Sequence, residues 1–290
     1  MIRRASDGLP ARVSGPWTQE KLAYLERYAR AFMTAMGPKR TPGQWSELVY
    51  MDSLAGPGRG IDRKTGAEFD GSPLRALKVT PPFDRLYFSD ANPKNVEALR
   101  RRILKDDQNR VDLRRGDCHA VAAEVVSRLS HRTLGLAFVD PEGFEVRFRL
   151  FETLATRRID VLYLFPGGIG IARNLSAFAK RAKAPLDDLI PGWRDLKRAR
   201  LAAGERMTAE DIAARDQPFV LAFMNRMRTL GYQYSEQGEP YFTNERNVRM
   251  YHLLFFSQHP AGLTLWTATL ICQAVSTRRS PFHASARPVS

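Results

Sequence analysis

Short apolar runs alternate with helix-forming stretches between residues 47 and 165, and this alternation constrains the fold more than any other feature. The apolar runs are Leu48–Met51, Leu86–Phe88, Val111–Leu113, Leu134–Val139 and Ile159–Phe165, and the candidate helices between them are Pro73–Val79, Pro93–Leu104, His119–Leu129 and Phe148–Thr156. Strands and helices that alternate in this way form a parallel sheet with helices on both faces. The sequence therefore predicts a doubly wound α/β fold.

The segments on either side of this core complete the predicted domain. Apolar residues three or four apart predict an amphipathic helix over Trp17–Met36, and the basic residues 172–216 are expected to form a helical insertion. The runs Gly231–Ser235 and Val248–Ser257 predict an antiparallel hairpin that closes a mostly parallel seven-stranded sheet, before a last helix over Leu263–Val275. We expect one domain over residues 17–276, with flexible tails at residues 1–16 and 277–290.

The charge balance favours a polyanionic partner. Lysine and arginine total 45 against 31 aspartates and glutamates, which gives a formal net charge of +14. Such a surplus is typical of proteins that bind nucleic acid, although many basic proteins have no such partner.

Cysteine and histidine usage narrows the class of protein further. Cys118 and Cys272 are far apart and the five histidines show no metal-ligand spacing, so we expect neither a disulfide framework nor a metal site. No run approaches the ~20 apolar residues that cross a bilayer, and the basic N-terminus lacks the apolar core of a secretory signal. The sequence thus predicts a cytoplasmic protein without a membrane partner.

A glycine-rich loop, DSLAGPGRG over residues 52–60, follows the first predicted strand, and acidic residues end this strand and the next two at Asp52, Asp90 and Asp117. Glycines at a strand's carboxyl end let the backbone approach a ligand, and a carboxylate there accepts ribose hydroxyls. The pattern indicates a nucleoside pocket, and the alternative is loops that only need turns and N-caps.

The spacing within the loop favours one cofactor. An acid, three residues and then Gly-x-Gly is the arrangement of S-adenosylmethionine-dependent methyltransferases with a Rossmann-like fold, whereas a phosphate-binding loop has a different pattern. We therefore expect S-adenosylmethionine as the cofactor. The candidate cofactor-binding residues are Asp52, Ala55, Gly56, Gly58, Ser72, Asp90, Asp117, Cys118 and Asp140.

Several motifs in order resemble the three-Cys-motif partner protein (TcmP) family. They are YMDSLAGPGRG, GSPLRAL, LYFSDANP, LAFVDPEGF and VLYLFPGG, and the carboxyl-terminal YHLLFFSQHPAGLTLW is also similar. The resemblance covers most of residues 17–275. It implies a class I methyltransferase-like fold and a partner protein with a three-cysteine motif, for which a radical-SAM type is one option.

The loop after the fourth predicted strand carries the candidate catalytic acids, Asp140 and Glu142. Methyl transfer needs alignment and a way to remove a proton, so one well-placed acid suffices. The alternative is that Asp140 caps the following helix. Amine methyltransferases place two prolines and then an aromatic residue here, and this chain departs from that pattern, so the motif does not imply amine methylation. Pro141, Phe144 and Pro166 are candidate substrate-binding residues.

The densest basic run with an adjacent aromatic residue lies in the predicted insertion. It contributes the candidate substrate-binding residues Trp193, Arg194, Lys197, Arg198 and Arg200. Several cations on one face are typical of phosphate contacts, and the alternative is a solvated helix face. Trp193 is a candidate for stacking on an unpaired base.

These observations lead to one function and two alternatives. We expect an S-adenosylmethionine-dependent methyltransferase that acts on nucleic acid together with a three-Cys-motif partner. The alternatives are a non-catalytic partner subunit that retains the cofactor pocket, and a methyltransferase of a small molecule or a protein.

Overall fold

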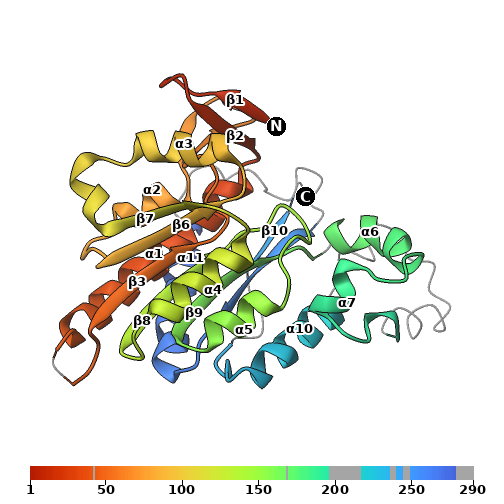
Figure 1. The fold of residues 1–290 in the computed structure, drawn as a ribbon. Helices are drawn as coiled ribbons and strands as arrows, with labels where there is room; N and C mark the ends of the chain where they lie inside the picture. Colours follow the sequence, from red (N-terminus) through yellow and green to blue (C-terminus); the bar gives the residue numbers. More distant parts are fainter. Residues whose placement is uncertain (42, 168, 196–216, 236–239, 244–248, 279–290) are drawn as a thin grey trace, which may run out of the picture.

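The apolar run after residue 47 forms an inner strand of a seven-stranded sheet in the computed structural model (Figure 1). The structure describes residues 1–290 except 42, 168, 196–216, 236–239, 244–248 and 279–290. The strands of this sheet are β3 (Glu47–Asp52), β6 (Arg85–Asp90), β7 (Val111–Arg115), β8 (Thr133–Val139), β9 (Arg158–Phe165), β10 (Tyr241–Thr243) and β11 (Arg249–Phe256). Their order is β10-β11-β9-β8-β3-β6-β7. The five neighbouring strands β9, β8, β3, β6 and β7 are parallel to one another. Strand β11 runs antiparallel to β9, and β10 runs antiparallel to β11. This order, with its reversed strand near one edge, confirms the predicted Rossmann-like class I methyltransferase fold.

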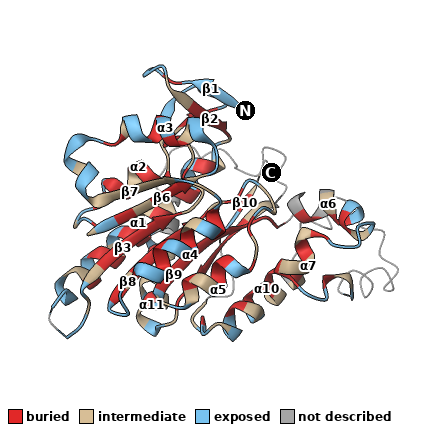
Figure 2. Cartoon of the chain, viewed as in Figure 1, coloured by how far each residue is buried: buried red, intermediate tan, exposed pale blue. Residues whose placement is uncertain are grey.

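Two layers of helices cover the sheet. One layer holds α1 (Trp17–Met36), α2 (Ser72–Leu77), α3 (Pro93–Arg102) and α11 (Pro260–Arg278), and the other holds α4 (Cys118–Arg128), α5 (Arg149–Ala155), α6 (Ile169–Ala179), α7 (Pro185–Leu189) and α10 (Gln217–Thr229). Short 3₁₀ turns cover Gly37–Lys39 and Lys105–Arg110. Alternate side chains of β3 face opposite layers, because successive residues of a strand point to opposite faces. Leu48 and Tyr50 pack with α1, whereas Val49 and Met51 pack with α4. Buried residues therefore fill both faces of the sheet (Figure 2).

The prediction of a flexible tail over residues 1–16 is wrong. This segment contributes β1 (Ile2–Arg4) and β2 (Pro10–Ser14) to a second sheet, which also contains β4 (Arg59–Asp62) and β5 (Glu68–Asp70) in the order β1-β2-β4-β5. Strand β2 runs parallel to β4, with Arg12 opposite Gly60. The segment is ordered by this pairing with residues far along the chain, and it has no apolar run of its own. The glycine loop accordingly leads into a strand, not directly into a helix.

The predicted hairpin is in part misplaced. Its second strand is β11, as expected, but its first strand is β10 at residues 241–243, and Gly231–Ser235 contributes only an isolated bridge between Tyr234 and Ser257. Tyr232 is fully buried and its hydroxyl donates to the Ile159 carbonyl oxygen at 3.0 Å. This stretch packs beside β9 as an anchor and does not form a full strand.

The insertion and the carboxyl terminus are described only in part. Helices α6 and α7 lie in the first part of residues 172–216, in agreement with the helical prediction, and residues 196–216 lie outside the described residues. Helix α11 extends to Arg278, and the rest of the predicted carboxyl-terminal tail also lies outside them.

Candidate active site

A cavity of about 490 Å³ opens at the carboxyl end of β3, where ligands bind in folds of this kind. Its walls come from the glycine loop, the second sheet, the start of α1, the loop after β8 and the start of β11. Five predicted cofactor-binding residues line it, namely Ala55, Gly56, Gly58, Ser72 and Asp140. The topology thus brings together residues that are far apart in the sequence.

Asp90, at the end of β6, fixes the glycine loop by a hydrogen bond. The Gly56 amide donates to Asp90 Oδ2 at 3.0 Å, and the Asn92 amide donates to Asp90 Oδ1 at 2.7 Å. Since a carboxylate offers about four acceptor sites, Asp90 keeps acceptor capacity for a ligand. Asp90 does not line the cavity among the described residues, so its predicted contact with the ribose stays a prediction.

The two glycines of the loop serve different purposes. Both have positive φ angles, 63° for Gly56 and 82° for Gly58, which few other residues adopt. A Cβ on Gly58 would lie 2.8 Å from Leu99 Cδ1, so Gly58 is required by packing against α3. A Cβ on Gly56 would meet nothing within 4 Å, so Gly56 borders open space in the cavity.

Asp52 is a fully buried carboxyl behind the glycine-loop wall. Its Oδ1 accepts from the Leu54 amide at 3.3 Å, and its Oδ2 makes no hydrogen bond of acceptable geometry within the described part of the chain. The pKa of Asp52 is raised from 3.8 to about 7, mainly by burial, with a lowering by the Ser72 hydroxyl and a smaller raising by the Asp140 carboxylate. Asp52, like Asp90, does not line the cavity among the described residues, so its predicted contact with the cofactor stays a prediction.

Asp140 pairs with a cation that the sequence analysis did not identify. Lys21, on the first turns of α1, donates to Asp140 Oδ2, and the two side chains are only 5% and 14% exposed. Burial lowers the pKa of Lys21, and the Asp140 carboxylate opposes that change. The carboxylate is thus held at the cavity wall by a buried ion pair. Asp140 does not cap α5, whose N-cap is Phe148.

Glu142 forms an ion pair with Arg12 of β2 and stays largely exposed at the mouth of the cavity. Arg59 and Arg63 lie on the same wall, and Arg59 is shared between Asp7, Glu68 and Asp70 at 3.4–3.7 Å. Arg63 is exposed and makes no ion pair with any described residue. The mouth of the cavity is therefore rich in guanidinium groups.

Two aromatic rings complete the mouth of the cavity. Trp17 stacks on Tyr251 with ring centroids 4.9 Å apart, and Lys21 Nζ lies 4.9 Å from the Trp17 ring. Both rings line the cavity. They offer flat apolar surfaces beside the cations.

Asp117 and Cys118 do not line this cavity but begin α4. Asp117 caps the helix by accepting from the amides of His119 and Ala120 at 3.1 Å. His119 Nε2 accepts from the Arg147 amide at 2.8 Å, which places its proton on Nδ1, beside Asp117. Although the ligand atoms of Asp117, Cys118 and His119 lie within 4.8 Å of one another, these hydrogen bonds already engage Asp117 Oδ1 and both ring nitrogens of His119. Burial also raises the pKa of the Cys118 thiol to about 11, so the group is best described as a helix cap.

The predicted substrate residues separate into two sets. Pro141 lines the cavity, whereas Phe144 packs edge-on against Phe178 of α6 with centroids 5.4 Å apart, and Pro166 is buried outside the cavity. Lys197, Arg198 and Arg200 lie outside the described residues.

The predicted stacking role of Trp193 is wrong. Its side chain is fully buried in the core beneath α7, and its indole Nε1 donates to Asp187 Oδ1 at 2.5 Å. Arg194 is also used within the fold, because it donates to the Phe178, Ala179 and Arg181 carbonyl oxygens and to Asp187. The two described residues of this basic run that were predicted to bind substrate, Trp193 and Arg194, are thus engaged within the fold.

The sequence analysis missed the residues that the N-terminal segment contributes, above all Arg12, Trp17 and Lys21. One signal was present, since Lys21 falls on the apolar face of the predicted Trp17–Met36 helix, between Thr18 and Leu25. A charged residue on a buried face needs a partner. The sequence alone does not give the partner, which lies 119 positions further on.

No family model matches the chain, and no curated protein matches it. Among solved structures, protein LPL1258 from Legionella pneumophila superposes with a TM-score of 0.47 at 12% identity, over 87% of this chain and 92% of that one. An rRNA methylase from Streptococcus thermophilus gives a TM-score of 0.38 at 6% identity, over 82% and 95% of the two chains. Trm5b from Pyrococcus abyssi gives 0.35 at 15% identity, over 78% and 48%. The fold assignment rests on the strand order described above. None of the described helices combines the length and hydrophobicity needed to cross a bilayer.

Proposed function

We propose that the protein binds S-adenosylmethionine in the cavity at the end of β3 and transfers its methyl group to a substrate that enters beside Asp140. The observation that carries the proposal is the buried, unpaired Asp52 oxygen behind a glycine loop, in a sheet with the strand order of class I methyltransferases.

The residues present suit this cofactor. The bare Gly56 lets the backbone approach a ligand, and Asp52 offers a carboxylate to an ammonium group. Asp90, which already orders the loop, would accept the ribose hydroxyls. When bound, the cofactor supplies a methyl group activated on a sulfonium.

We assign to Asp140 the removal of the proton that the substrate loses on methylation. A nucleophile that gains a methyl group loses a proton, and Asp140 is an acid at the cavity wall with Oδ2 occupied by Lys21. Its second oxygen is left for the substrate. Lys21 fixes the orientation of the carboxylate, so Lys21 is a positioning residue and Asp140 the proton acceptor.

The mouth of the cavity supports a nucleic-acid substrate. Arg12, Arg59 and Arg63 supply the guanidinium groups that phosphates favour, and the stacked Trp17 and Tyr251 rings supply a platform for a base. We therefore place the substrate contacts at the second sheet and the start of α1, since Trp193 is buried and Arg194 is engaged by backbone carbonyl oxygens and Asp187. The target is an unpaired nucleotide, because a base must leave a duplex to reach such a cavity.

Methyl transfer is tested with radiolabelled S-adenosylmethionine and separate pools of single-stranded RNA, single-stranded DNA and protein. Wild type should label one nucleic-acid pool, and Asp140→Asn should lose turnover while still binding the cofactor. Asp106→Asn, an exposed acid in the Lys105–Arg110 turn, is the matched control and should label normally. Label found only on protein would refute the nucleic-acid substrate, and unchanged turnover in Asp140→Asn would refute the assigned role.

A three-Cys-motif partner stays a prediction that rests on the resemblance alone. Co-expression with such a protein, followed by size-exclusion chromatography, tests it. A complex that forms while the isolated chain shows no turnover would favour the partner-subunit alternative.

A further inference from the structure

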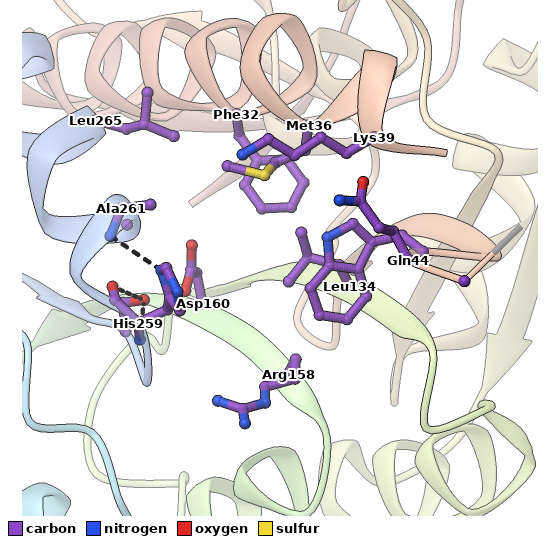
Figure 3. A pocket seen from close by; sticks show the side chains of 14 residues that line it. Phe32, Met36, Lys39, Gln44, Leu134, Arg158, Asp160, His259, Ala261 and Leu265 are labelled. Carbon is purple, nitrogen blue, oxygen red and sulfur yellow. Dashed lines mark hydrogen bonds between the residues drawn. The ribbon is translucent and has the colours of Figure 1, made fainter. Parts of the chain in front are cut away.

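A second cavity, of about 420 Å³, opens at the opposite end of the parallel strands (Figure 3). It lies where the parallel strands begin, beside Leu134 of β8 and Arg158 of β9, and α11 starts at its wall. Its volume falls within the ~300–1,000 Å³ typical of small-molecule sites. Helix α1 connects the two cavities, because Lys21 faces the first and Met36 the second, about 22 Å apart along the helix.

One wall of this second cavity is apolar and flat. It is lined by Phe32 and Met36 from the end of α1, by Trp45 before β3, and by Leu134 and Leu265. Trp45 is only partly buried. Such a wall suits the faces of a planar ring.

Asp160 supplies the one carboxylate among the described lining residues. Its side chain is 8% exposed, and its Oδ2 accepts from the Tyr28 hydroxyl at 2.6 Å. No described cation pairs with it, and burial raises its pKa to about 6, against a lowering by the hydroxyls of Ser257 and Tyr28. The carboxylate keeps capacity to accept N–H groups.

Cations and donors surround the opening. Figure 3 shows Lys39 and Arg158 on opposite sides of it, with Asp160 and His259 on the wall between them. Lys39 and Arg158 are exposed and make no ion pair with a described residue. His259 Nδ1 accepts from the Ala261 amide at 3.1 Å, which leaves Nε2 as an N–H donor. Three donors at the rim and one buried acceptor call for a ligand with an anionic end and an N–H-bearing ring.

We propose that this cavity binds a purine nucleotide, with the ring against Trp45 and the apolar wall, the N–H edge on Asp160, and the phosphate between Lys39, Arg158 and His259. Guanine presents two N–H donors on one edge and adenine presents one amino group, so a guanine nucleotide should bind more tightly. The proposal is independent of the methyltransferase function.

Calorimetric titration of the full chain with GMP, AMP, guanosine and inorganic phosphate tests the proposal. GMP should bind at least about 10-fold more tightly than AMP or phosphate, because hydrogen bonds to a charged group are strong. Asp160→Asn, Trp45→Ala and Arg158→Gln should each weaken GMP binding by about 10-fold or more. Trp45 and Arg158 lie at the rim, so the test survives even if Asp160→Asn fails to fold. Arg128→Gln on α4, which does not line the cavity, should bind GMP as wild type does.

Four results would overturn the proposal. The first is no GMP binding at millimolar concentration. The second is equal binding of phosphate and GMP, which would leave only an anion site. The third is displacement of GMP by S-adenosylmethionine, and the fourth is unchanged GMP binding in the Trp45 and Arg158 variants. Either of these two results would place the nucleotide elsewhere.

Discussion

Replacing Asp52 by asparagine should make the ligand-free protein more stable and lower its affinity for the cofactor. Folding raises the pKa of this buried acid from 3.8 to about 7, so the folded state holds the proton more tightly than the unfolded chain. The folded state therefore loses stability as pH rises from about 4 to about 7, and the loss persists above pH 7. At 1.36 kcal/mol per pKa unit, the cost at pH 8 is about 4 kcal/mol as an upper bound. Asp52→Asn removes this cost.

Urea unfolding of both proteins at pH 5 and pH 8 measures the difference. The variant should gain about 2–3 kcal/mol on wild type between the two pH values. Its affinity for S-adenosylmethionine should fall by about 10- to 100-fold, because a hydrogen bond to a charged group is lost. Glu97→Gln, at an exposed position on α3, is the control and should show no such gain in stability. A variant that is less stable than wild type at pH 8, or that binds the cofactor equally well, would refute the reasoning.

Three further predictions concern residues that the structure places in unexpected surroundings. Lys21→Met should lower stability by about 3–5 kcal/mol in urea, because it leaves Asp140 buried without its cation, whereas Lys21→Arg should retain most of it. Trp193→Ala should destabilise the fold by about 3–5 kcal/mol and leave the salt dependence of nucleic-acid binding unchanged, since the ring is buried; a changed salt slope with normal stability would contradict this. In a thiol-labelling assay at pH 8, exposed Cys272 should react and buried Cys118 should not, and two equally reactive thiols would contradict the burial of Cys118.

The main sheet could be predicted from sequence because its strands are continuous apolar runs. A central parallel strand is buried on both faces, so β8 and β9 stand out from the polar helices around them. The glycine loop could also be located from sequence, because it directly follows the first of these apolar strands. These features are local, and a short window of sequence contains them.

The second sheet could not be predicted because its strands are stabilised by distant pairing. Ile2-Arg3-Arg4 is exposed and carries no strand pattern, and β2 is joined to the rest of the chain by its pairing with β4, with Arg12 opposite Gly60. The same limit applies to the site, where the partner of Asp140 comes from α1 and that of Glu142 from β2. A basic run such as the one after Trp193 is ambiguous for another reason, because composition does not distinguish a solvated face from side chains that satisfy carbonyl oxygens.

The measurement that tests the central claim most directly is calorimetric titration with S-adenosylmethionine of wild type, Gly56→Val and Gly66→Val. Gly56 and Gly66 have similar positive φ angles, 63° and 74°, and a Cβ on either meets nothing within 4 Å, so the backbone strain of the two substitutions is matched. Only Gly56 lines the cavity, while Gly66 lies in the turn between β4 and β5. We predict that wild type and Gly66→Val bind one cofactor per chain and that Gly56→Val does not. Absence of binding to wild type, or equal binding to the two variants, would contradict the assignment of this cavity.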